Sequence, residues 1–152
     1  MRSMADWDEV LDALRLALEG GDAPAIRAGL EDCWDATAPT DAAQRCVLAH
    51  YLADVQPDVA DEVAWDERAL EAYTRVGDTD LMPVGVASAA GFAPSLHLNL
   101  GDGYRRLGRL DEARAQLEAG TAAADTLSDD GYGAMIRAGL DRLAARLDGT
   151  SR

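Results

Sequence analysis

Lysine is absent from the sequence: all 14 basic side chains are arginines, and 28 aspartates and glutamates leave a formal net charge of −14. A field of that sign repels the phosphate backbone of nucleic acids and the anionic head groups of lipids. We therefore expect neither nucleic acid nor a membrane surface among the partners. Basic or neutral partners are compatible with this charge, although such acidity also has a plain interpretation as a determinant of solubility.

Cysteines and long apolar runs are scarce as well. Cys33 and Cys46 are the only cysteines; they form no CxxC motif and provide no disulfide framework. Their helical, apolar contexts predict buried free thiols in a reducing compartment. No stretch approaches the roughly 18 uninterrupted apolar residues of a membrane-spanning helix, and the N-terminal residues lack the apolar run of a signal peptide. We expect a cytoplasmic protein.

The motifs of common enzymes are also missing. Gly101-Asp102-Gly103 falls inside a predicted helix rather than after a strand, so it is not a phosphate-binding loop. The sequence has no GxSxG elbow, and no histidine is placed to activate either cysteine. We therefore expect a protein that is not an enzyme, with no catalytic residues, no cofactor and no metal.

Apolar positions recur three and four residues apart almost throughout, while no convincing alternating strand pattern occurs. The pattern predicts an all-α fold of about seven helices in one domain, residues 1–152. Short connections favour antiparallel neighbours. Residues 79–93 carry a weak signal, interrupted by proline and glycine, which fits either a short helix or an ordered loop. The expected helices span about 5–19, 22–36, 40–55 (capped by Thr40), 57–76, 94–107, 110–127 and 131–148.

Residues 94–127 carry a more specific pattern of small and aromatic residues: Leu100-Gly101, Tyr104, Leu107-Gly108, Ala113, Leu117 and Gly120. They resemble the tetratricopeptide repeat, a pair of helices with a period of about 34 residues and such markers. Gly101 and Ala113 are slim where the two helices would cross, and Tyr104 would fill the space beside them. His97 and Asp125 stand where the family has its tryptophan and its late proline.

The resemblance extends more weakly to the rest of the chain. Residues 41–76 look like a degenerate copy, 5–36 form a helical pair without the signature, and 131–148 would cap the stack. The arrangement is similar to small bacterial members of the tetratricopeptide-repeat family. It implies antiparallel helical hairpins stacked into a right-handed superhelix. Gly29 and Gly139, each in the middle of a predicted helix within an Ile-Arg-Ala-Gly-Leu segment, further predict a helix passing close to each.

In that family the first helices of successive pairs line a concave groove that holds a peptide or a partner's helix. The resemblance therefore implies a groove at Ser95, Leu98, Asn99, Asp102, Arg105 and Arg106. The Asn99 amide can both donate to and accept from a peptide backbone, although an exposed asparagine is also often simply solvated. The two arginines suit a carboxylate, or they pair with Asp102 as an ordinary helix end.

His50 and Asp54 lie four residues apart on one face of the third predicted helix, which would border the same groove. A polar groove wall explains the pair better than a metal site, because a zinc site needs further ligands and only one other histidine exists.

The leading hypothesis is a non-enzymatic protein- or peptide-binding adaptor or scaffold that uses the concave face. One alternative is a self-assembling protein, for example a homodimer, in which the last helix packs against a second copy. A third is a small-molecule sensor or hydrolase at the His50 region. The side chains expected to serve self-assembly are Met135, Leu140, Leu143 and Leu147.

Overall fold

The computed structural model describes residues 7–150, and within that range it contains seven α-helices, three short 3₁₀ helices and no strand. This confirms the predicted all-α fold of about seven helices. The predicted start of the first helix at residue 5 lies outside the described residues. The α-helices are α1 (Trp7–Leu18), α2 (Ala23–Ala36), α3 (Ala42–Asp54), α4 (Val59–Tyr73), α5 (Ala93–Arg106), α6 (Leu110–Ala123) and α7 (Gly131–Thr150).

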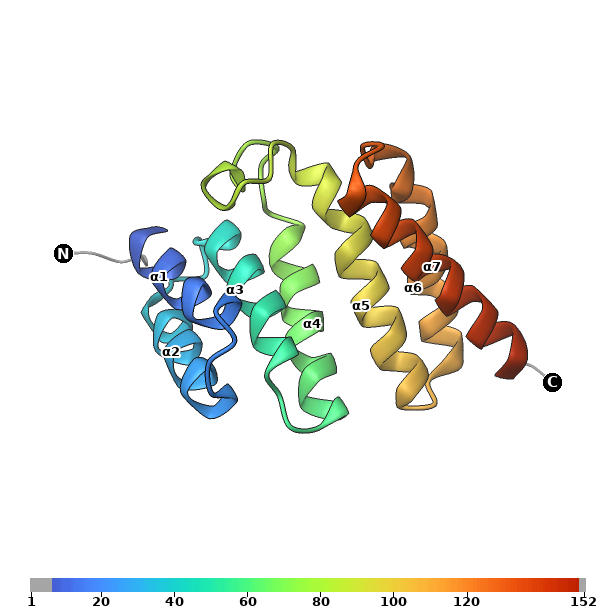
Figure 1. Ribbon diagram of the computed structural model, residues 1–152, viewed down its shortest axis with the longest axis horizontal. Helices are drawn as coiled ribbons and strands as arrows, with labels where there is room; N and C mark the ends of the chain where they lie inside the picture. Colours follow the sequence, from blue (N-terminus) through green and yellow to red (C-terminus); the bar gives the residue numbers. More distant parts are fainter. Residues whose placement is uncertain (1–6, 151–152) are drawn as a thin grey trace.

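The helices follow one another across the molecule in chain order, from α1 at one end to α6 and α7 at the other (Figure 1). α3 packs most extensively against α4, and α5 packs most extensively against α6. The α4–α5 contact joins these two hairpins, and α7 packs against both α5 and α6. Each helix therefore buries its apolar face mainly against helices that are near it in the sequence.

Local signals explain some of the helix ends. Asp22 caps α2 by accepting a hydrogen bond of 3.3 Å from the Ala25 N–H. Gly108, with φ of +78°, closes the end of α5. The predicted cap of the third helix is wrong: Asp41, not Thr40, holds that position. Its carboxylate accepts from the Ala38 N–H at 2.8 Å, so it ties down the preceding turn instead of the helix.

The segment between α4 and α5 is an ordered loop with two short 3₁₀ helices, η1 (Met82–Val84) and η2 (Ala89–Phe92). Leu81 of this loop is fully buried and packs against the core formed with α1, α2 and α3. The Ala89 carbonyl accepts a hydrogen bond of 2.9 Å from the Tyr73 hydroxyl. The sequence left open a short helix or an ordered loop for residues 79–93, and the structure is closer to the ordered loop.

The predicted crossing of α5 and α6 at small residues is present. A Cβ on Gly101 would lie 3.4 Å from the Ala113 carbonyl oxygen and 3.0 Å from Leu143 Cδ2, so α6 and α7 both approach α5 here. Ala113 is fully buried and Tyr104 is buried beside it. A methyl group added at residue 101 would have to displace its neighbours.

The two glycines of the Ile-Arg-Ala-Gly-Leu segments behave differently. A Cβ on Gly139 would lie 2.6 Å from Leu98 Cδ2, which confirms the predicted close approach of α5 to α7. Nothing lies within 4 Å of a Cβ on Gly29, so the same prediction is wrong for α2. The five-residue match between the segments therefore does not reflect a shared packing role.

The side chains expected to serve self-assembly are mostly used inside the chain. Leu140, Leu143 and Leu147 are buried between α7 and its neighbours, and only Met135 of the four is exposed. The free thiols also differ from each other: Cys46 is fully buried, as predicted, whereas Cys33 is only half-buried. α7 therefore completes the core instead of presenting a leucine face to a second copy.

Candidate functional site

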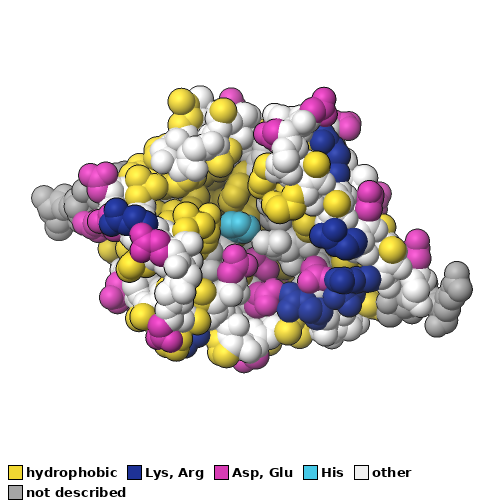
Figure 2. All heavy atoms as spheres, viewed as in Figure 1, with side chains coloured by type: hydrophobic (Ala, Val, Ile, Leu, Met, Phe, Trp, Pro, Cys, Tyr) yellow, Lys and Arg dark blue, Asp and Glu magenta, His cyan; other side chains and the backbone are white. Residues whose placement is uncertain are grey.

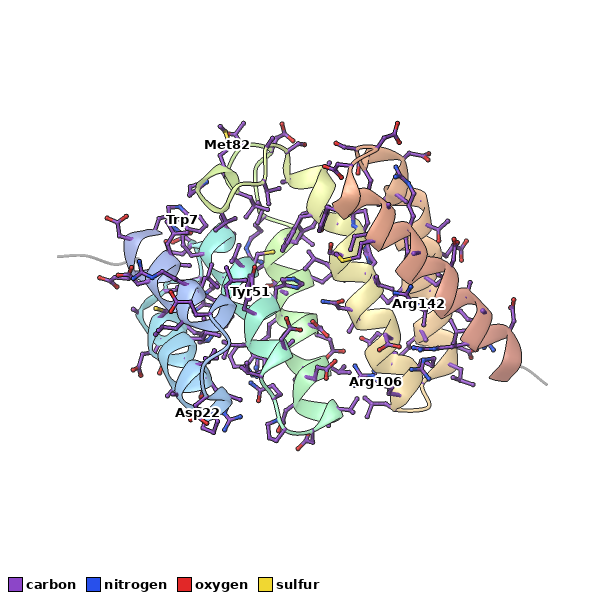
Figure 3. The ribbon with its side chains drawn as sticks, viewed as in Figure 1. Trp7, Asp22, Tyr51, Met82, Arg106 and Arg142 are labelled. Atoms are coloured by element: carbon purple, nitrogen blue, oxygen red, sulfur yellow. The ribbon has the colours of Figure 1, made fainter. Side chains whose placement is uncertain are left out.

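A polar cavity of about 220 Å³ opens where α3, α4, α5 and α7 come together. Asn99 of α5 lies among its lining residues, with acidic side chains from α3 and α4 and arginines from α5 and α7. Figure 3 labels two of these arginines, Arg106 on α5 and Arg142 on α7. The lining residues are Asp54, Glu62, Asp66, Leu98, Asn99, Asp102, Arg106, Gly139, Arg142, Leu143 and Arg146.

Asp66 is the most buried acid of the cavity. Its side chain comes from α4, the residue is only 3% exposed, and its Oδ2 atom has no hydrogen-bond partner. Burial, which is the largest cause, acts together with the charges of Glu62 and Asp54 to raise the pKa of Asp66 to about 8. Asp66 is therefore mostly protonated at pH 7, which allows it to sit beside two other carboxylates.

The opposite wall carries several arginines, which surround the carboxylate of Asp102. Arg106 pairs with Glu62 of α4 and donates from Nε to Asp102 at 3.0 Å. Arg105 reaches the same carboxylate at 3.0 Å, and Arg146 of α7 approaches it at 3.8 Å. One aspartate thus joins α5 to α7, while Arg106 joins α5 to α4.

Arg142 differs from its neighbours. It lines the cavity from α7 and is exposed, yet it forms no ion pair or hydrogen bond with any other residue in the range 7–150. The space-filling view shows acidic and basic side chains side by side on this hollowed face (Figure 2). The cavity is therefore charged with opposite signs at its two ends, with an arginine available at the basic end.

The structure brings together five of the eight residues that the sequence placed at the groove: Asp54, Leu98, Asn99, Asp102 and Arg106 all line the cavity. The other three lie elsewhere. Arg105 pairs with Asp102 from outside the cavity. Ser95 is buried and shares a hydrogen bond with the Tyr132 hydroxyl of α7.

His50 is the third residue outside the cavity. Its ring packs edge-on against Phe92 and Tyr51, with centroids 5.0 and 5.5 Å away. Its Nδ1 atom is buried without a hydrogen-bond partner, and burial lowers the pKa of His50 to about 4. The imidazole is therefore neutral at pH 7. No group of three or more His, Cys, Asp or Glu side chains in residues 7–150 is arranged to hold a metal ion.

Four charged lining residues were missed in the sequence: Glu62, Asp66, Arg142 and Arg146. The signal that could have found them is a pair of like charges four residues apart, which is unfavourable on an isolated helix. α4 carries such an acidic pair, and α7 carries a basic one. An acidic pair on one helix and a basic pair on another are both unfavourable alone. Together they indicate that the two helices face the same cavity, where the opposite charges compensate each other.

Comparison with protein-family models, with curated proteins and with solved structures finds no match for this chain. No helix among the described residues is both long enough and apolar enough to cross a membrane.

Proposed function

We propose that this chain is a non-enzymatic adaptor that binds a protein or peptide partner on the face formed by α3, α4, α5 and α7. The observation that carries the proposal is the position of Asn99. Its half-buried side chain lines the charged cavity and forms no hydrogen bond with any other described residue. A primary amide offers both donors and an acceptor, which is what an extended peptide backbone requires.

The size of the cavity favours a peptide over a whole small molecule. Pockets that enclose a drug-sized ligand measure about 300–1,000 Å³, and this one has about 220 Å³. It has room for one side chain of a larger partner, whose backbone would then run along the surface past Asn99. The resemblance of residues 94–127 to the tetratricopeptide repeat supports the same use of this face.

The charges of the cavity support a partner rather than a reaction. Asp102 and Arg106 are already paired with each other, so neither is poised as an acid, a base or a nucleophile. Arg142, which has no such pairing among the described residues, is available for a carboxylate of the partner. The arrangement suits recognition of a polar segment by hydrogen bonds and charge.

Selection of 12-residue peptides from a random display library against the folded chain tests the proposal. The selected peptides are then measured by fluorescence anisotropy on the wild type, on the Asn99→Ala/Arg142→Gln double variant and on Arg15→Gln. Arg15 is a matched control because it is an exposed arginine on α1, far along the chain from the cavity.

We expect the double variant to bind at least about tenfold more weakly, since two lost hydrogen-bonding groups are worth roughly 1 kcal/mol each. Arg15→Gln should bind like the wild type. The proposal is rejected if the library yields no binding peptide, or if the double variant binds its peptides as tightly as the wild type does.

A further inference from the structure

We infer that the acidic end of the cavity, formed by Asp54, Glu62 and Asp66, receives a lysine or arginine side chain of the bound peptide. The inference rests on the proposed function and names the chemistry of the partner. It is carried by three features of the described residues: an unsatisfied buried carboxyl group, an excess of acids in the lining, and an opening sized for one side chain.

The first feature is the Oδ2 atom of Asp66. Buried polar side-chain atoms almost always have a hydrogen-bond partner, so each exception needs a cause. Asp66 is 3% exposed, lines the cavity, and leaves Oδ2 without a partner among the described residues. An ammonium or guanidinium group in the cavity would donate a hydrogen bond to this atom, and such bonds between charged groups are the strong ones.

The second feature is the balance of charge. Four acids line the cavity, Asp54, Glu62, Asp66 and Asp102, against three arginines. Asp66 is held neutral by its burial and by Glu62 and Asp54, with Glu67 of the same helix acting in the same direction and Arg106 of α5 opposing them. With Asp66 neutral, the other three carboxylates balance the three arginines, so the charge of one further cation would be balanced when Asp66 loses its proton to solvent as the cation arrives.

The third feature distinguishes an organic cation from a metal ion. Calcium and magnesium require several oxygen ligands converging at a fixed short distance. No group of acids, histidines or cysteines in residues 7–150 converges in that way. The opening of about 220 Å³ instead accommodates an extended side chain that carries its own hydrogen-bond donors. The arginines at the other end exclude a second cation and fix the direction of the peptide.

The test uses peptides selected from the random library on the full chain, with two variants and a control. Asp66→Asn keeps the shape of the side chain but cannot ionise, and Asp54→Asn removes a carboxylate at an exposed position that cannot disturb the core. Asp61→Asn is the matched control, because Asp61 is an exposed acid on α4 that does not line the cavity.

We expect the peptides selected on the wild type to share a lysine or arginine at one position, and replacement of that residue by norleucine to weaken binding about tenfold or more. Asp66→Asn or Asp54→Asn should cause a similar loss, and Asp61→Asn should cause none. Calorimetry in two buffers of different ionisation enthalpy should detect release of nearly one proton per peptide at pH 7, and Asp66→Asn should abolish that release.

The outcomes separate the inference from the function on which it rests. Selected peptides without a shared cation, or a cation preference that survives in both cavity variants, would overturn the inference and leave peptide binding intact. Binding without proton release would remove Asp66 as the receiving group and also overturn it. Failure to select any peptide would reject the proposed function together with the inference.

Discussion

The hydroxyl of Tyr104 donates a hydrogen bond of 2.6 Å to Glu67 Oε2, which ties α5 to α4. The Arg109 guanidinium lies over the Tyr104 ring, 4.5 Å from its centroid. Nearby, a Cβ on Gly103 would lie 2.6 Å from Val63 Cγ2, so the two helices are closely packed. This contact joins the hairpin of α3 and α4 to the hairpin of α5 and α6.

Tyr104→Phe should therefore lower the free energy of unfolding by about 1 kcal/mol, the usual net contribution of one hydrogen bond. Urea unfolding followed by circular dichroism measures the change. In the Tyr104→Phe/Glu67→Ala double variant, the free energy of unfolding should fall little further than in Tyr104→Phe alone, because both substitutions remove the same hydrogen bond. Additive losses, or an unchanged midpoint for Tyr104→Phe, would show that this bond does not hold the hairpins together.

Two glycine-to-alanine substitutions should have opposite effects on stability. Gly29→Ala enters open space in the middle of α2, so it should raise the free energy of unfolding by up to about 1 kcal/mol through helix propensity. Gly101→Ala meets Leu143 Cδ2 at 3.0 Å and Gln116 Cβ at 3.3 Å, and the resulting strain of about 1–3 kcal/mol should outweigh the same gain. Thermal unfolding of both variants measures these changes. An equal rise of the melting temperature in both variants would contradict the close packing around Gly101 of α5.

Asp66 should make the protein less stable as the pH rises. Its native pKa of about 8 is above the ordinary 3.8, so between these values the native state binds more protons than the unfolded state. Stability from this group is present below pH 4 and is lost as the pH rises to about 8.

The Asp66→Asn variant has no titrating proton at this position, so it should gain stability relative to the wild type across that range. The limiting slope is about 1.4 kcal/mol per pH unit, and we expect a total of a few kcal/mol between about pH 5 and pH 9 by urea unfolding. Parallel pH profiles for the two proteins would show that Asp66 is ionised in the native state.

His50 should act in the opposite direction at lower pH. Burial lowers its pKa from 6.5 to about 4, so in this interval the unfolded state binds the extra proton. Stability from neutral His50 is present above about pH 6.5 and is lost as the pH falls towards 4, by up to about 3 kcal/mol. His50→Gln should lose less stability over this range. NMR titration of the imidazole resonances provides a direct check; a midpoint near 6.5 would contradict the burial.

Most of the helices could be predicted from the sequence because they bury one stripe, and the spacing of that stripe is a local feature of the chain; α3 is the exception, since it is buried on nearly all sides. The crossing at Gly101 and Ala113 could also be predicted, because slim residues at helical spacing within 94–127 fit a close helix–helix contact. Gly29 had the same local appearance as Gly139, and only the tertiary packing distinguishes them.

Some residues of the cavity could be predicted from the sequence, because they lie on one face of a single helix. Asn99 and its neighbours on α5 follow from the face of a single helix, so the repeat pattern located them. The approach of Asp66 to Arg106 and of Arg146 to Asp102 depends on how α4 and α7 are oriented against α5. This orientation cannot be read from the sequence of any one helix. His50 lies close in sequence to Asp54 but packs against an aromatic ring of η2 instead of lining the cavity.

The packing of helices in chain order has a consequence for how the protein is made. The cluster that contains Val10, Ile26, Leu30 and Leu48 is assembled from α1 to α4 and from the loop before α5, without any residue of α6 or α7. During synthesis the N-terminal hairpins can thus bury most of their apolar surface before the last helices leave the ribosome. The charged cavity, which needs Arg142 and Arg146 from α7, is the last part to form, so a truncated chain would fold in part and yet have no complete site.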